Sequence, residues 1–169
     1  MPPFYDIYGL SERRDIETIE IFLNHFCYRD KVEDRDKHEI GIFKNDKYGV
    51  DELIIQIKTL SEVIEYAVNN KKQCFVFYIE DYLKKNIGHI ILKFKYDEKV
   101  IFGISIEEKI LTENGQLVDN YEEALIIEKE ISKLTNATKT SIQFEYPPSD
   151  TEEEFDSDIE LWRSMNDEK

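Results

Sequence analysis

Residues 90–106, with the sequence IILKFKYDEKVIFGISI, decide the fold of this chain. Their first half alternates apolar residues with lysines, Asp97-Glu98 follows as a short charged break, and one face of the second half carries Phe102, Ile104 and Ile106. A hydrophobic period of two is typical of strands, and a short turn between two such runs favours an antiparallel hairpin. We therefore expect the fold to be built outward from this hairpin.

Further strands are predicted on both sides of the hairpin. Residues 74–79 are apolar at every position, which is expected of a central strand that is covered on both faces. The last strand should end at Pro147-Pro148, because proline cannot donate a hydrogen bond to a ladder. The predicted strands are residues 4–8, 40–43, 74–79 and 140–146, and the predicted turns are Asn45–Gly49 and Asn114-Gly115.

Three helices are predicted from apolar residues that recur three and four positions apart. They cover residues 15–27, 60–68 and 121–134. Ser11 is the expected cap of the first helix. Thr59 with Glu62, and Asp119 with Glu122, have the spacing of capping boxes for the other two.

The order of these elements predicts an α+β fold: strand, helix, strand, helix, three strands, helix and strand. A chain of 169 residues suits a single domain. We expect residues 1–148 to form it around a largely antiparallel sheet of about five or six strands with two or three flanking helices. Residues 149–169 are expected to form an acidic C-terminal segment.

Charge is distributed unevenly along the chain. It has 37 acidic and 22 basic residues, a net charge of −15, although 41 % of its residues are hydrophobic, which is too many for a disordered acidic chain. Residues 149–169 alone hold nine acidic and two basic residues, a net charge of −7. Within them Phe155, Ile159, Trp162 and Met165 recur at helical spacing, which predicts a short amphipathic helix.

This acidic segment is the candidate partner-binding site. Its apolar stripe either docks on a partner or packs on this protein's own sheet while the carboxylates face solvent. The excess of negative charge favours a basic protein as the partner. The candidate partner-binding residues are Asp150, Glu152, Glu153, Glu154, Asp156, Asp158, Glu160 and Trp162.

Direct binding of nucleic acid is not expected. Seven lysines lie between residues 71 and 99, but no arginine cluster or RNA-recognition signature accompanies them, and the net charge repels phosphate. Those lysines could instead pair with the acidic segment.

We recognise no cofactor or metal motif, and expect neither. His25, Cys27, Cys74 and His89 do not have the spacing of a zinc module. Asp156, Asp158 and Glu160 copy the start of a calcium loop, but the glycine that such a loop requires does not follow.

Glu107 and Lys109 at a strand end, with Asp97 before them in the sequence, are the one hint of catalysis. Their arrangement resembles the acid and lysine sites of restriction-endonuclease-like enzymes. This resemblance covers three residues, and implies carboxylates that hold Mg²⁺ and a lysine that helps to activate water. A metal-dependent phosphodiesterase or nuclease is therefore one alternative function.

The favoured function is a non-enzymatic, acidic binding or inhibitor protein. The chain has neither a secretory signal nor an apolar run that could span a bilayer, and two cysteines suit a reducing compartment, so we expect a cytoplasmic protein. In size and acidity it is similar to immunity proteins that neutralise basic nuclease-type toxins, and to inhibitors of other nucleic-acid enzymes, without a shared motif. A structural subunit of a complex is a further alternative.

Overall fold

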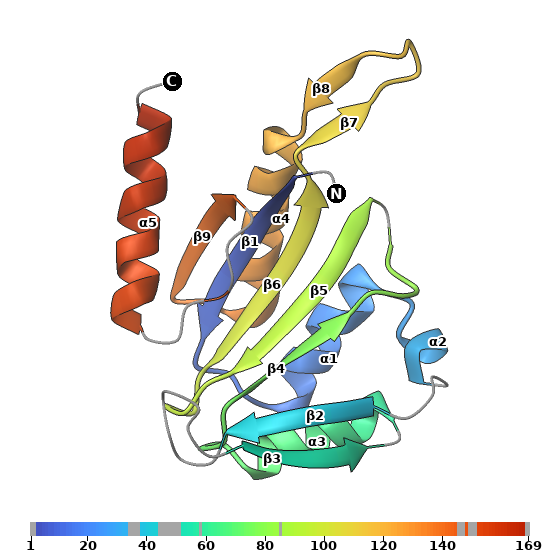
Figure 1. The fold of residues 1–169 in the computed structure, drawn as a ribbon, viewed down its shortest axis with the longest axis vertical. Coiled ribbons are helices and arrows are strands. Elements are labelled where there is room, and N and C mark those ends of the chain that lie inside the picture. The colour runs from blue at the N-terminus through green and yellow to red at the C-terminus, as the bar shows by residue number, and fades with distance from the viewer. Residues whose placement is uncertain are drawn as a thin grey trace.

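The computed structural model describes residues 3–33, 38–43, 52–57, 59–84, 86–144, 148 and 152–167. Their centre is an antiparallel sheet of five strands in the order β4-β5-β6-β1-β9 (Figure 1). The strands are β1 (Phe4–Ser11), β4 (Phe75–Ile79), β5 (Ile87–Phe94), β6 (Val100–Glu107) and β9 (Lys139–Phe144). With helices on one face and an acidic C-terminal helix, this confirms the predicted α+β single-domain fold.

Strands β5 and β6 form the predicted hairpin. Phe94 pairs with Val100 beside the turn, and the ladder continues through Ile90 opposite Ile104. Strand β6 lies in the middle of the sheet, between β5 and β1, and its residues from Val100 to Ile106 are all buried. The quoted stretch is therefore the centre of the sheet.

The prediction of a central strand over residues 74–79 is wrong. Strand β4 lies at one end of the five-stranded order, paired with β5 alone within that sheet. One face of β4 enters the main core, whereas on the other Val76 is half-buried and Tyr78 is 48 % exposed. The second face of β4 is therefore only partly covered, although it too carries apolar residues. Strand β4 also contacts β2 (His38–Phe43).

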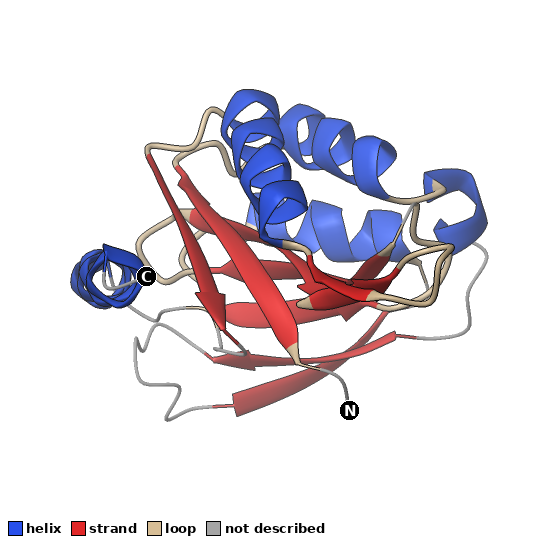
Figure 2. Ribbon diagram, turned by 90° about the horizontal axis from the view of Figure 1, so that it is seen from above, coloured by secondary structure: helices blue, strands red, loops and turns tan. Residues whose placement is uncertain are grey.

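Helices α1 (Ile16–Phe26), α3 (Leu60–Asn69) and α4 (Tyr121–Thr135) cover one face of the sheet (Figure 2). The predicted cap at Thr59 is confirmed, because its side chain accepts a hydrogen bond from the Glu62 amide. Ser11 is not a cap: it ends β1, and its hydroxyl donates to the Thr135 carbonyl at 2.7 Å.

Two other caps complete the helical layer. Asp15 caps α1 by accepting a hydrogen bond from the Thr18 amide at 2.8 Å. The capping box predicted at Asp119 does not form, since Asn120 is the N-cap of α4 and Asp119 accepts from the Tyr121 amide instead. The N-cap of helix α1 is therefore Asp15, four residues after the predicted cap Ser11, because an aspartate is an equally good N-cap.

Smaller elements lie around this core. The turn at Asn114-Gly115 is confirmed, with Gly115 at a φ of 79°, and it joins β7 to β8. Residues 52–57, to which no element is assigned above, form a strand that pairs with the strand predicted at 40–43. The turn predicted at Asn45–Gly49 lies outside the described residues. These elements are α2 (Arg29–Glu33), β2 (His38–Phe43), β3 (Glu52–Ile57), β7 (Lys109–Leu111) and β8 (Leu117–Asp119).

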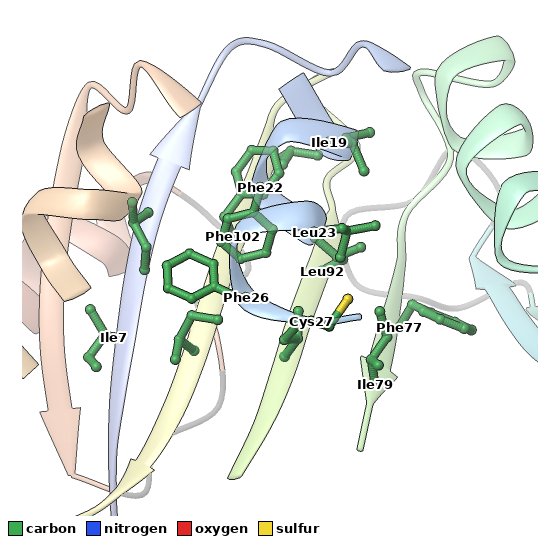
Figure 3. Close-up of a cluster of buried hydrophobic side chains, with 14 of the residues drawn as sticks. Ile7, Ile19, Phe22, Leu23, Phe26, Cys27, Phe77, Ile79, Leu92 and Phe102 are labelled. Atoms are coloured by element: carbon green, nitrogen blue, oxygen red, sulfur yellow. The ribbon is translucent and has the colours of Figure 1, made fainter. Parts of the chain in front are cut away.

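The main hydrophobic core lies between the three helices and the sheet (Figure 3). Phe22 of α1 points at Phe102 of β6, with ring centroids 4.8 Å apart, and both side chains are fully buried. Cys27 lies in the same cluster, and burial raises the pKa of its thiol to about 11. Both cysteines, Cys27 and Cys74, are buried free thiols.

Arg14, in the loop between β1 and α1, is buried and 2 % exposed. All five of its N–H groups donate to backbone carbonyls, which belong to Ala67, Asn70, Lys71, Gln73 and Lys95 at 2.6–3.0 Å. Its guanidinium also lies over the Phe94 ring, 5.1 Å from the centroid. Arg14 therefore joins the C-terminal end of α3 to the end of β5.

Candidate functional site

Helix α5 (Glu152–Asp167) carries most of the predicted partner-binding residues. It lies beside β9, apart from the three helices that cover the sheet (Figures 1 and 2). Its Phe155 is 1 % exposed, and Ile159 is partly buried. They belong to a second, smaller apolar cluster with Tyr8, Leu10, Ile91 and Ile101. The described part of the apolar stripe thus packs on this protein's own sheet.

Two lysines of the sheet hold the first turns of α5. Lys99 donates to Glu152 at 2.9 Å, while Lys139 lies 3.1 Å from Glu152 and 2.7 Å from Asp156. Hydrogen bonds from the two lysines lower the pKa of Glu152, and the same contacts raise the pKa of Lys99 and of Lys139. Pairing of the acidic segment with the lysines of residues 71–99 is therefore confirmed for Lys99.

A third lysine ties the chain just before α5 to the sheet. Lys93 of β5 is buried, and its ammonium donates to the carbonyl of Pro148 at 3.3 Å. Together with the ion pairs and Phe155, this contact fixes the start of α5 on the sheet.

The opposite side of α5 presents carboxylates to solvent. Glu153, Glu154 and Glu160 are exposed. At 100° per residue, Glu153 and Glu160 lie with Ser157 on the side of the helix turned away from Phe155, and Glu154 lies on the flank, 100° from Phe155. We call these three glutamates the outer carboxylates.

The remaining predicted residues have other surroundings. Glu152 and Asp156 take part in the ion pairs with the sheet. Asp158 is half-buried, and its charge adds to the burial that raises the pKa of Tyr8. Asp150 lies outside the described residues, and so does the side chain of Trp162, whose backbone belongs to α5.

We expect Glu152→Gln to weaken the docking of α5 more at pH 7 than at pH 3. The pKa of Glu152 is lowered from its ordinary 4.5, so its stabilising contribution is present above 4.5 and is lost as the pH falls through the folded-state value. The pKa of Lys99 is raised above 10.5, so its contribution is complete below 10.5 and is lost as the pH rises through its folded-state value.

The measurement is the urea midpoint of wild-type and variant at both pH values, followed by the fluorescence of Trp162, the single tryptophan and a residue of α5. Screening by solvent limits the Lys99–Glu152 pair to under about 1 kcal/mol, so a double-mutant cycle with Lys99→Met should isolate it. Glu153→Gln, the adjacent outer carboxylate, is the control and should leave both midpoints unchanged. Equal losses for Glu152→Gln at pH 3 and pH 7 would contradict this assignment.

A buried polar chain lies on the same face of the sheet as Tyr8. The Ser105 hydroxyl donates to the Asp6 carboxylate, and its oxygen lies 2.8 Å from His89 Nε2. In a serine hydrolase the histidine stands between the serine and the aspartate, so that it can take the serine proton. Here Ser105 stands in the middle and is fully buried, and its hydroxyl donates to Asp6. These three residues therefore do not have the arrangement of a serine nucleophile.

The residues that resemble a restriction-endonuclease-like site are not brought together. Asp97 lies in the β5–β6 turn, 3.0 Å from Lys95, whereas Glu107 ends β6 at the other end of an eight-residue strand. A strand of that length extends about 25 Å. The acid and lysine arrangement that this resemblance implies is therefore absent from Asp97, Glu107 and Lys109.

A pocket of about 320 Å³ lies on the helical side of the sheet, between α1, α4 and the ends of β5 and β6. Apolar side chains line its floor, and His25 pairs with Glu130 across its rim at 3.1 Å. The floor consists of Phe26, Ile87, Ile106, Ile110 and Ile127.

No sequence pattern above points to this pocket. Its lining comes from separate segments, and within α4 the spacing of Asn120, Glu123, Ile127 and Glu130 is that of any helix face. Only the pairing of the sheet and the packing of α1 against α4 bring these residues together.

Two further features of the described residues concern metal binding and membrane insertion. Their His, Cys, Asp and Glu side chains form no group of three or more that could hold a metal ion. Their helices include none that combines the length and the hydropathy needed to cross a bilayer. Compared with family models, curated proteins and solved structures, the chain has no match.

Proposed function

We propose that this chain is a non-enzymatic binding protein whose outer carboxylates dock a basic protein. The observation that supports the proposal is that different parts of the α5 surface contact the sheet and solvent. Phe155 and the two ion-paired lysines hold one side of the helix on the sheet, while Glu153, Glu154 and Glu160 are exposed on the rest of its surface. A helix fixed in this way presents its charges without an ordering cost on binding.

The proposed partner is a basic nucleic-acid enzyme, as in an immunity protein that neutralises a nuclease-type toxin. Such enzymes attract the phosphates of their substrates through Lys and Arg side chains. The outer carboxylates carry the same negative charge as those phosphates. Complementary charge between the two proteins accelerates association at low salt. The net charge of −15 supplies a long-range field in the same sense.

The first test is capture from a lysate of the native host on immobilised protein, with and without the outer carboxylates. At about 0.01 M salt, where charges act over about 30 Å, we expect the wild-type chain to retain a basic protein. Replacing Glu153, Glu154 and Glu160 with glutamine should abolish its retention. Purified, the captured protein should cleave DNA or RNA, and the wild-type chain should suppress that cleavage.

The matched control removes the same charge elsewhere. Glu17, Glu65 and Glu122 are exposed on the helices of the other face, and replacing all three with glutamine also changes the net charge from −15 to −12. This control should retain the partner. Capture that survives the loss of the outer carboxylates, or equal losses in both triple variants, would refute α5 as the docking surface.

A further inference from the structure

The pocket on the helical side is separate from α5 and has its own chemistry. We propose that it binds a small organic cation, an amine or guanidinium carried on a short apolar body. Its volume of about 320 Å³ is at the small end for ligand pockets. It corresponds to roughly ten water-sized volumes, so the ligand would have about ten non-hydrogen atoms.

The floor of the pocket selects an apolar body. Ile87 of β5 and Ile110 of β7 are half-buried and expose apolar surface to the pocket, while Phe26, Ile106 and Ile127 are nearly fully buried in the main core. Water in contact with such a surface is displaced favourably by an apolar group, with a gain of about 25 cal/mol for each Å² covered. Recognition of charge must therefore come from the rim.

Lys84 and His25 on the rim of the pocket already have acceptors. Lys84 donates its ammonium to the Asn24 carbonyl at 2.8 Å, at the C-terminal end of α1. His25 Nε2 lies 3.1 Å from Glu130 Oε2. A ligand that offered a carboxylate or phosphate would have to compete with both of these contacts.

Hydrogen-bond acceptors on the rim of the pocket, by contrast, remain available to a ligand. Asn120 is 7 % exposed, and its amide nitrogen donates to the Glu107 carbonyl at 3.1 Å. Within the described part of the chain, no donor reaches its side-chain oxygen, and a buried acceptor without a donor is costly. Glu123 lines the same pocket one helical turn away and adds a carboxylate.

Charge around the mouth points the same way. Glu122 and Glu123 lie in the first turn of α4, and Asp119 directly precedes its N-cap. Their negative charges offset the helix dipole that would otherwise attract an anion. A cation between Asn120, Glu123 and the second oxygen of Glu130 would find acceptors on each side, with its apolar body on the isoleucine floor.

The test compares three probes of one shape and different charge, titrated into the full chain at low salt and followed by amide chemical shifts. They are 2-phenylethylamine, neutral 2-phenylethanol and anionic 3-phenylpropionate. We expect the amine to bind about fivefold to tenfold more tightly than the alcohol, and the carboxylate to bind least. The shifted amides should be those of α4 and of the C-terminal end of α1.

Glu123→Gln should weaken the amine about fivefold to tenfold and leave the alcohol unchanged. Glu65→Gln is the control, since Glu65 is exposed on α3 and does not line the pocket. Equal binding of amine and alcohol, tighter binding of the carboxylate, or no binding of any probe at millimolar concentration would each overturn the proposal.

Discussion

Replacing Arg14 with methionine should remove about 3–5 kcal/mol of the free energy of unfolding, a large share of the stability of a domain of this size. The guanidinium supplies five donors to five backbone carbonyls. Methionine fills the space but donates nothing, so those carbonyls would be left in the interior without their partner. Burial lowers the pKa of Arg14 to about 10, so the side chain remains charged at neutral pH.

Arg14→Lys should also destabilise the chain, by at least about 2 kcal/mol, because an ammonium has three donors and no planar fork. Urea unfolding at pH 7 measures both variants. Arg13→Met, which removes the same charge from the adjacent exposed residue, should have almost no effect. A tolerated Arg14→Lys would mean that charge, rather than the geometry of the five hydrogen bonds, holds α3 to β5.

Phe155→Ala should release α5 from the sheet. Among the described side chains of α5, Phe155 alone belongs to the buried part of the smaller cluster. Truncation of a buried phenylalanine costs about 3–5 kcal/mol. Because α5 lies beside the sheet rather than inside the main core, we expect local undocking before global unfolding. Hydrogen exchange should therefore show faster exchange of α5 amides with little change in β5 and β6.

Phe155→Leu keeps an apolar side chain in place and should cost under about 1.5 kcal/mol, with α5 still docked. If the account of α5 is right, Phe155→Ala also weakens binding of the basic partner, because the outer carboxylates are then no longer held in position. Unchanged exchange in the α5 of Phe155→Ala would show that the ion pairs of Glu152 and Asp156 alone are sufficient to dock the helix.

The hydrophobic periodicity of the sequence predicts those elements that bury one whole face or both faces. The β5–β6 hairpin, α1, α3 and α4 follow from spacings of two, three and four, since these elements bury whole faces. The edge position of β4 could not be predicted. Apolar residues on both faces of a strand show that both faces are covered, but not whether neighbouring strands of the same sheet or a second small sheet lie beside it. Strand β3 was missed although its apolar run was visible.

The candidate sites depend on contacts that leave no local signal. Arg14 gives no sign in its own segment that five carbonyls from distant residues will surround it. The acidity of α5 is visible in the sequence, but which carboxylates pair with the sheet depends on Lys99 and Lys139, which approach from the β5–β6 turn and from β9. The pocket is assembled from α1, α4 and the strand ends, so tertiary packing alone creates it.

The most direct test of the central claim is the association rate constant of the captured basic protein with this chain, measured at about 0.01 M and about 0.15 M salt. For the wild-type chain we predict a fall of about tenfold or more between the two conditions. The variant without the outer carboxylates should associate more slowly at low salt and respond less to added salt, while the Glu17, Glu65 and Glu122 control stays near wild type. The same rate and the same salt dependence in both triple variants would contradict the claim that α5 docks the partner.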